Sequence, residues 1–407
     1  MRARIRFLPA MLAACTLPAG AADLLQAVAR APALEAAHRR IDAARARTES
    51  AGRLANPEVE AMGSRASMVD ENRNMWEVNV RQPLPKRGER AADRDRAQAA
   101  TAMAEADYAA MAGEIAADAA MALAEAEAAE ARVRLLETQL GRLAAVLQTV
   151  EARLASGNTR LADHLIVQSR IGAMQLMLEQ ERRMAADARA DTRGRLGFAS
   201  DAPLPEFAAP APAEIVADDT AALRLAAARH AEAEAMAKMA RASANPMTSV
   251  GLRLERGQTR LGNEDTIGLA FMSEIPWRSR GYARADIRAA EADRAAARAD
   301  GTAARFRIAS ALTRVERADR LAATARRLAG ETRARLAAEY DSLVHTAAAS
   351  RGGESTVLQT VEILDKATEI EAQLIQADTA ARTARAELWR YAPASRLLDR
   401  SSSNFPP

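Results

Sequence analysis

The side chains best suited to acid–base or metal chemistry are few in this chain of 407 residues: one cysteine and four histidines. His164 adjoins one glycine-containing turn, and His345 lies shortly before a second. A zinc site needs several histidine, cysteine or carboxylate ligands that converge on one face. Neither histidine has such ligands at a suitable spacing, and the 15 methionines are scattered. We therefore expect no metal site and no cofactor.

The sequence also lacks the motifs that mark enzymes, namely a glycine-rich phosphate loop and a nucleophile motif. Acidic and basic residues are interleaved, the formal net charge is only +3, and few aromatic residues stand among the bases. Domains that bind nucleic acid carry instead a clustered basic patch. We therefore expect neither an enzyme nor a nucleic-acid-binding protein.

The cysteine, Cys15, stands in an N-terminal segment that looks like a secretory signal peptide. Three arginines precede an apolar stretch at residues 7–17, and a run of small residues ends at Ala21. A basic start, a short apolar stretch and a small-residue cleavage site define such a signal. We expect removal of residues 1–21 by cleavage after Ala21. The four residues that end at Cys15 leave an alternative, a lipoprotein signal with acylation of Cys15.

Composition favours long, closely packed helices over a thick globular core. Hydrophobic residues make up 49% of the chain, but aromatic residues only 3%, and charged residues make up 27%. Large aromatic rings dominate burial in globular cores, whereas this balance is typical of long helices. Two series of apolar residues have coiled-coil spacing: Leu136, Leu140, Leu143, Leu147, Val150 and Leu154, and Ile363, Ala367, Ile370, Leu374, Ala377 and Ala381.

The chain contains an internal duplication. Asn56-Pro57 and Asn245-Pro246 each end a helical stretch, and Pro85 and Pro276 each precede a long alanine-rich helix. These landmarks recur in the same order at an offset of about 190 residues, which indicates a tandem repeat. The expected parts are a first repeat at 22–196, a Pro-rich linker at 197–217, a second repeat at 218–392 and a flexible tail at 393–407.

Each repeat is expected to contain a helix, two short strands, a very long helix, a glycine turn and a shorter helix. The expected helices cover residues 23–55, 87–155 and 160–196 in the first repeat, and 218–244, 282–350 and 355–391 in the second. At 1.5 Å per residue, each long helix would reach about 100 Å. The sequence therefore predicts two long antiparallel helical hairpins.

Four segments alternate apolar and polar residues, as strands with one apolar face do. They are Pro57–Ser67, Trp76–Arg81, Ser249–Glu255 and Thr266–Phe271. Such strands can cross a bilayer when tilted, with one face toward lipid and one toward water. Four strands cannot close, and open edges in lipid leave backbone groups unpaired. We therefore expect several chains to share one barrel, to which three chains would supply twelve strands. A half-buried soluble sheet is the alternative.

These residues resemble the TolC-like outer membrane efflux protein family. The resemblance rests on Ala55–Val59, Val78–Gly88 and the turn Gly157–Asp163, and it covers essentially all of the mature chain. It implies a homotrimer with a twelve-stranded transmembrane β-barrel in outer-membrane lipid, continued across the periplasm by an α-barrel tunnel of antiparallel helices. Such channels have no catalytic residues. They export passively and dock onto an RND-type inner-membrane pump through a periplasmic adaptor protein.

The resemblance also points to a gate, because charged residues at the helix turns close the periplasmic end of these channels. The acid expected six residues after the first turn glycine is Asp163. In the second half that position is Gln359, and an acid follows three residues later at Glu362. Ser355 stands where the family has an arginine, so Arg160 could offer a substitute cation. The candidate gate residues are thus Asp163, Glu362 and Arg160, with solvated surface charges as the alternative.

The sequence gives weaker indications of the exported substrate and of the class of protein. The Arg256-Gly257 turn and the Ile275-Pro276 helix entry look more like the heavy-metal (CusC/CzcC-like) branch of the family, so heavy-metal cations are a candidate substrate. A periplasmic coiled-coil adaptor is an alternative, but it would normally have one hairpin flanked by compact β domains. A structural coiled-coil protein of an envelope-spanning complex would explain the apolar seams but not the duplicated strands.

Overall fold

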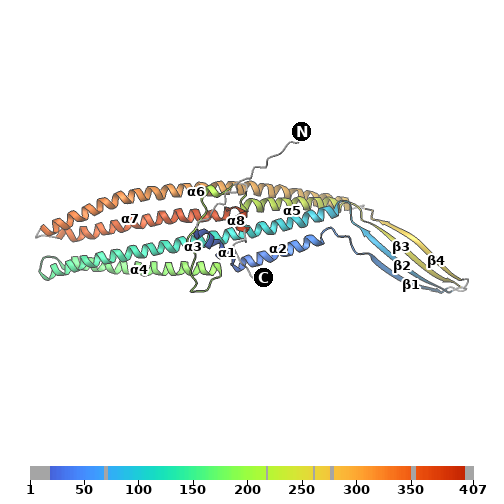
Figure 1. Ribbon diagram of the computed structural model, residues 1–407, viewed down its shortest axis with the longest axis horizontal. Helices are drawn as coiled ribbons and strands as arrows, with labels where there is room; N and C mark the ends of the chain where they lie inside the picture. The colour runs from blue at the N-terminus through green and yellow to red at the C-terminus, as the bar shows by residue number, and fades with distance from the viewer. Residues whose placement is uncertain are drawn as a thin grey trace, which may run out of the picture.

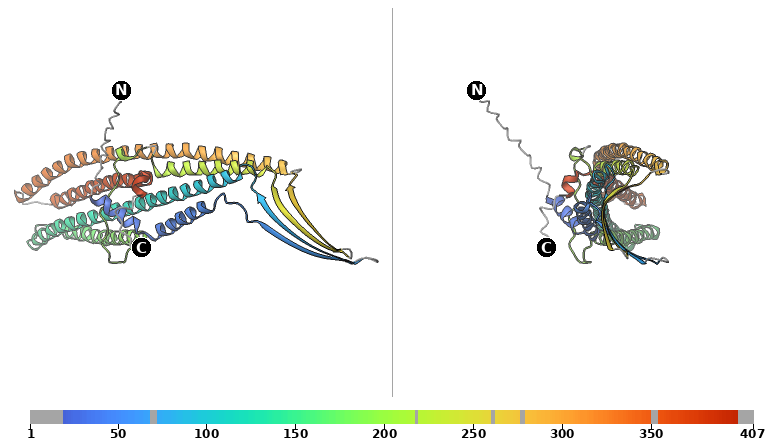
Figure 2. Two further views of the ribbon diagram at one scale, coloured as in Figure 1. Left: turned by 45° about the vertical axis from the view of Figure 1, so that its right-hand side comes forward. Right: turned by 90° about the vertical axis from the view of Figure 1, so that its right-hand side faces the viewer.

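The computed structural model describes residues 19–67, 72–216, 219–259, 262–275, 279–349 and 354–398. The molecule is long and narrow, with a four-stranded sheet at one end and paired helices along the rest (Figure 1). Viewed from the sheet end, the helices lie in an open arc (Figure 2). The predicted fold class, mainly α with a small β part, is confirmed. Cys15 lies outside the described residues.

The same order of elements occurs twice. The first series is α1 (Ala19–Ala29), α2 (Pro32–Ser50), β1 (Glu58–Ser67), β2 (Asn72–Leu84), α3 (Glu89–Ala155) and α4 (Leu161–Leu196). The second is α5 (Ala221–Ser243), β3 (Thr248–Thr259), β4 (Gly262–Ser273), α6 (Ser279–Ala349) and α7 (Glu354–Ala386), followed by η2 (Glu387–Tyr391) and α8 (Ala394–Leu398). The linker between them contains one short turn of helix, η1 (Pro212–Glu214).

The single helix expected over residues 23–55 is wrong in two places. The helix breaks at Ala31, whose backbone is extended (φ −62°, ψ 131°) just before Pro32. Proline has no N–H to donate, and it disfavours helical geometry in the residue before it. The second part then ends at Ser50, shortly before Gly52 takes a φ of 67°. That left-handed conformation commonly terminates helices.

The expectation of a flexible tail from residue 393 is wrong for its first residues. They form α8, in which Ala394 and Leu397 are buried against the core of the helical body. The helix expected over 355–391 also ends earlier, at Ala386, and continues as η2. Residues 399–407 lie outside the described part of the chain.

The long helix α3 joins the two halves of the molecule. α2 and α4 lie along it one after the other, and α5 and α7 pack on it from the second repeat (Figure 1). Within the first predicted seam, Leu136, Leu143 and Val150 are buried at seven-residue intervals, as packed helices require. On α6, alanines are buried at the same seven-residue interval: Ala283, Ala290, Ala297, Ala304 and Ala311. No helix among the described residues combines the length and the apolar character needed to cross a membrane.

The core of the helical body lies where the linker and the end of the second repeat cross α3. Trp389 is fully buried, and its indole Nε1–H donates to the carbonyl oxygen of Ala208 in the linker at 2.9 Å. A Cβ atom at Gly113 of α3 would lie only 2.7 Å from the carbonyl oxygen of Trp389. Backbones cross so closely at this point that only glycine fits there.

All four strands form one antiparallel sheet in the order β1-β2-β3-β4. The two repeats meet between β2 and β3, where Val78 lies opposite Leu254. The predicted strands are confirmed and are longer than most of the alternating segments. The expected turn at Arg256-Gly257 is wrong, because Gly257 lies inside β3 and pairs with Met75 and Glu264. Within the described ranges, the outer edges of β1 and β4 have no partner strand.

Candidate functional site

The sheet has two faces of opposite chemistry. Residues directly opposite each other in antiparallel strands share a face, so the register assigns each side chain. The apolar face carries Val59, Ala61, Trp76, Val78, Val80, Val250, Leu252, Leu254, Ile267, Leu269 and Phe271. The polar face carries Glu58, Glu60, Glu77, Asn79, Arg81, Arg253, Glu255 and Thr266. The predicted alternation thus holds over most of the sheet. The exceptions include Gln82, Arg256 and Asp265 on the apolar face and Met62 and Ala270 on the polar face.

The apolar face is the more exposed of the two at the centre of the sheet. Val78 and Leu254 are exposed by 38% and 40%, and Leu269 on the edge strand by 92%. On the polar face, the side chains of Glu77 and Glu255 are only 25% and 24% exposed and pair with Arg253. This is the reverse of a soluble sheet, which buries its apolar face. An exposed apolar surface of this kind marks contact with a partner or with lipid.

At the end of the molecule farthest from the sheet, Asp163 caps the turn between α3 and α4. Its Oδ2 accepts hydrogen bonds from Thr159 Oγ1 (2.9 Å) and from the backbone N–H of Arg160 (3.4 Å). The first N–H groups of a helix have no partner within the helix, so a carboxylate placed there stabilises the turn. Gly157 makes the turn itself, with a φ of 71°. Asp163 and Arg160 therefore act together in the structure of this helix start.

Glu362 has a different partner. On α7 its carboxylate pairs with Lys366 Nζ at 2.8 Å, one helical turn further on. The hydrogen bond from Lys366 lowers the pKa of Glu362, and the same contact raises the pKa of Lys366. Both side chains are exposed, so the pair adds little to stability. The structure thus brings Asp163 and Arg160 together and places Glu362 in a separate ion pair. The second turn glycine, Gly353, lies outside the described residues.

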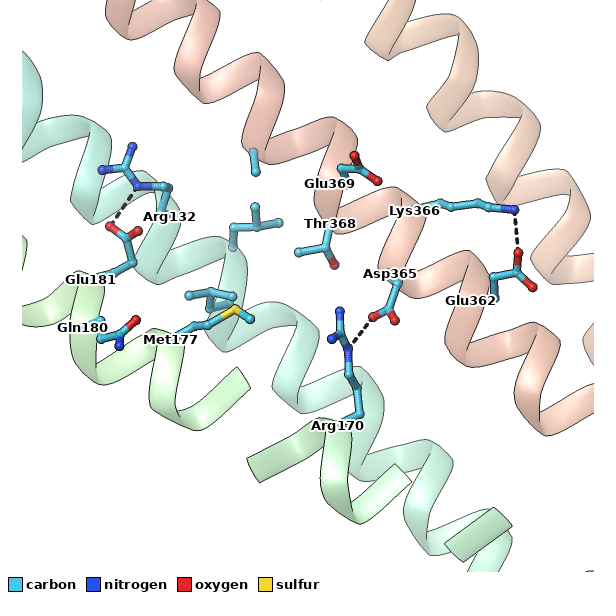
Figure 3. A pocket seen from close by; sticks show the side chains of 13 residues that line it. Arg132, Arg170, Met177, Gln180, Glu181, Glu362, Asp365, Lys366, Thr368 and Glu369 are labelled. Carbon is cyan, nitrogen blue, oxygen red and sulfur yellow. Dashed lines mark hydrogen bonds and ion pairs between the residues drawn. The ribbon is translucent and has the colours of Figure 1, made fainter. Parts of the chain in front are cut away.

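A groove of about 470 Å³ lies between the two hairpins and is lined by α3, α4 and α7 (Figure 3). Arg170 of α4 reaches toward Asp365 of α7, and its Nε donates to the Asp365 carboxylate at 2.8 Å. Each of these side chains is about one-third exposed. Further along the groove, Arg132 of α3 pairs with Glu181 of α4 at 2.8 Å. The first pair joins one hairpin to the other, whereas the second lies within one hairpin.

Arg170 and Asp365 have no signal in the sequence. They belong to no motif and are 195 residues apart, so only the packing of α4 beside α7 brings them together. Lys366 was within reach of sequence reasoning, because it follows Glu362 by four residues. Opposite charges at that spacing pair on a helix surface.

The histidines do not form a metal site in the part of the chain that the structure describes. His164 lies beside the α3–α4 turn, with its Nε2 3.5 Å from Glu151 Oε1. His38 pairs with Asp42, and His230 accepts a hydrogen bond from Arg298. Among the described residues, no group of three or more histidine, cysteine, aspartate or glutamate side chains could hold a metal ion.

Residues 24–197 match the sequence profile of a known family, described as Outer membrane efflux protein. This part of the chain has the signature of the outer membrane efflux proteins. The match begins within α1 and ends at the glycine that follows α4, so it spans nearly the whole expected first repeat. Proteins of this family are channels and not enzymes. Comparison with curated protein sequences gives no match.

Solved structures of similar fold extend over both halves of the chain. The outer-membrane channel OprN is 18% identical with a TM-score of 0.71, and the alignment covers 93% of this chain and 90% of OprN. The outer membrane protein VceC from Vibrio cholerae is 16% identical with a TM-score of 0.70, and the alignment covers 91% of this chain and 95% of VceC. CusC is 16% identical with a TM-score of 0.69, and the alignment covers 92% of this chain and 91% of CusC. The three scores are nearly equal, so they show a shared fold and do not single out a CusC-like branch.

Proposed function

We propose that this protein is the outer-membrane channel of a tripartite efflux system and exports its substrate passively to the exterior. The exposed apolar face of the sheet is the observation that carries the proposal. Lipid would cover that face, and the ion-paired polar face would line a water-filled pore. The efflux-protein signature of residues 24–197 and the fold shared with OprN support the same function.

The open edges of the sheet favour a homotrimer. β1 and β4 each present a row of backbone groups without a partner strand among the described residues. In lipid such groups cost several kcal/mol each, about the value for an unsatisfied amide in an apolar solvent. Pairing β1 of one copy with β4 of the next would remove both edges. Three copies would then close a transmembrane barrel of twelve strands.

The helices would form the periplasmic part of the channel. α3 has 67 residues and α6 has 71, so each spans about 100 Å at 1.5 Å per residue. The open arc of helices in one copy (Figure 2) would become a closed tunnel in three copies. The free ends of the hairpins are the parts that reach farthest from the membrane. We propose that they meet a periplasmic adaptor and, through it, an RND-type inner-membrane pump.

The hairpin ends are also the proposed place of the gate. Asp163 and Arg160 organise the α3–α4 turn, and Glu362 lies on the helix that begins at the other turn. Threefold symmetry would repeat each acid as a ring, which attracts cations and favours their passage. Arg170 and Asp365, which join the two hairpins close by, are further candidates for holding the tunnel closed.

Heavy-metal cations are the substrate that we propose, on the sequence resemblance alone. One of its two supports is weakened, because Gly257 lies in a strand and not in a turn. The test is growth: a strain without this protein should become sensitive to particular heavy-metal salts and regain resistance on complementation. Sensitivity to organic drugs alone would identify a different substrate class.

A periplasmic adaptor or a structural coiled-coil protein would leave the apolar face of the sheet without a role. Channel activity separates these possibilities directly. Purified protein added to planar bilayers should give discrete conductance steps, and heat-denatured protein should give none. Repeated failure to conduct, together with recovery of the protein as a soluble monomer without detergent, would exclude the proposed channel.

A further inference from the structure

The apolar face of the sheet is divided into rows of residues that lie opposite one another across the strands. Three consecutive rows contain almost only apolar side chains. They are Gln82, Val250 and Phe271; Val59, Val80, Leu252 and Leu269; and Ala61, Val78, Leu254 and Ile267. The next row, toward the end of the sheet away from the helices, is Gly63, Trp76, Arg256 and Asp265, which we call the Trp76 row. The chemistry of the face therefore changes abruptly at this row.

The two charged residues of the Trp76 row form a bidentate ion pair. Arg256 Nε and Nη2 donate to the two carboxylate oxygens of Asp265 at 2.7 and 2.9 Å. Both side chains remain exposed, at 61% and 57%, although their neighbours in the next row are Leu254 and Ile267. On the lipid side of a membrane strand, charge is tolerated near the interface and not at mid-depth. This pair therefore limits how deeply the sheet can enter a bilayer.

Trp76 lies in the same row of the sheet as this ion pair and indicates the same depth in a membrane. Its side chain is on the apolar face and is 65% exposed, and its ring lies over Gly63 of the neighbouring strand. A Cβ atom at Gly63 would lie 3.1 Å from the indole ring, so the absence of a side chain at Gly63 leaves room for the ring of Trp76. Tryptophan is enriched where acyl chains meet headgroups, because its ring is apolar and its N–H is polar.

We propose that the Trp76 row lies at the headgroup level of the outer leaflet and that the three apolar rows below it contact the acyl chains. The inference rests on the proposed function and adds the depth of insertion. Rows on one face are two residues apart, about 7 Å along a strand. Three rows thus cover about 20 Å, and less when the strands tilt, against about 25 Å for a typical barrel. The surrounding bilayer should therefore be locally thinned.

Quenching of tryptophan fluorescence by brominated lipids tests the depth. The chain has three tryptophans: Trp277 can be replaced by phenylalanine, and Trp389 is fully buried in the helical body. The full-length Trp277→Phe protein is inserted into phosphatidylcholine vesicles with bromine near the headgroup (carbons 6 and 7) or deeper (carbons 11 and 12). Shallow bromine should quench the Trp76 signal at least twofold more than deep bromine.

A matched variant moves the indole one row deeper on the same strand and the same face. Trp76→Phe with Val78→Trp, in the Trp277→Phe background, should reverse the order, and Leu252→Trp is the substitute if that variant does not assemble. If deep bromine quenches Trp76 as well as shallow bromine does, the proposed depth is wrong, although membrane insertion stands. If no brominated lipid quenches any variant, the sheet is not in the membrane and the proposed function fails with it.

Discussion

The Nε of Arg170 on α4 lies 2.8 Å from the carboxylate of Asp365 on α7, and the two residues are 195 positions apart in the chain. The ion pair connects the two hairpins across the groove that α3, α4 and α7 line (Figure 3). Any movement that separates α4 from α7 must break it. If the hairpins part when the channel opens, this contact favours the closed state.

Loss of that ion pair should therefore raise the open probability of the channel. A partly exposed ion pair contributes up to about 1 kcal/mol, which corresponds to up to about a fivefold change in an equilibrium. Arg170→Gln and Asp365→Asn should each show this increase in planar-bilayer recordings, and the exchange Arg170→Asp with Asp365→Arg should restore closure. Arg132→Gln is the control, because Arg132 pairs with Glu181 inside one hairpin. If Arg132→Gln raised the open probability equally, the contact between the hairpins would have no particular role in closing the channel.

The carboxylates at the hairpin ends should contribute to closure and to cation binding. The double variant Asp163→Ala with Glu362→Ala should raise single-channel conductance and weaken block by multivalent cations. Asp163→Ala alone should also loosen the α3–α4 turn, because its Oδ2 caps that helix. Loss of a cap costs about 1 kcal/mol. Wild-type conductance and cation block in the double variant would mean that these acids are ordinary surface charges.

The assignment of one face of the sheet to lipid and the other to the pore can be tested with two neighbouring residues. Val78→Asp would place a charge on the apolar face, where a basic residue at mid-membrane costs about 2–4 kcal/mol and an acid somewhat less. Asn79→Asp would place the same charge on the polar face, directly opposite Arg253. Trimer yield after detergent extraction should fall for Val78→Asp and stay normal for Asn79→Asp. Equal yields would show that the two faces are wrongly assigned.

The close crossing at Gly113 should make that glycine essential for stability. A Cβ atom would lie 2.7 Å from the carbonyl oxygen of Trp389, so Gly113→Ala should destabilise the protein by about 1–3 kcal/mol through overpacking. Gly141, on the same helix, has no neighbouring atom within 4 Å of such a Cβ. Gly141→Ala should therefore be neutral or stabilise by up to about 1 kcal/mol. Thermal unfolding followed by circular dichroism compares the two, and similar melting temperatures would contradict this packing.

Periodicity predicted most of the fold because the elements are long and regular. Seven-residue spacing of apolar residues predicts the buried side of α3 from Leu136 to Val150, and alternation predicts the two faces of β2. The positions at which helices break or end were harder to predict from the sequence. The break at Pro32 and the end of α2 before Gly52 depend on single residues, whose signals were outweighed by the helical pattern around them.

The candidate site was predictable only where its contacts are local. Asp163 follows a turn glycine and caps its own helix, and Glu362 pairs with a residue four positions away. Arg170 and Asp365 come together only because two helices from different repeats pack side by side. No residue spacing within either repeat encodes that contact, because it depends on how the two repeats pack together.

Closure of the sheet between copies is the central claim, and disulfide cross-linking in isolated outer membranes tests it most directly. One cysteine replaces Ala61 on β1, and a second replaces Asp265, Ile267 or Leu269 on β4. Within one copy, three strand spacings of about 4.8 Å separate β1 from β4, too far for a disulfide. At least one pair should therefore give covalent trimers, and nothing larger, on non-reducing gels. Exclusively monomeric protein for all three pairs would contradict the shared barrel.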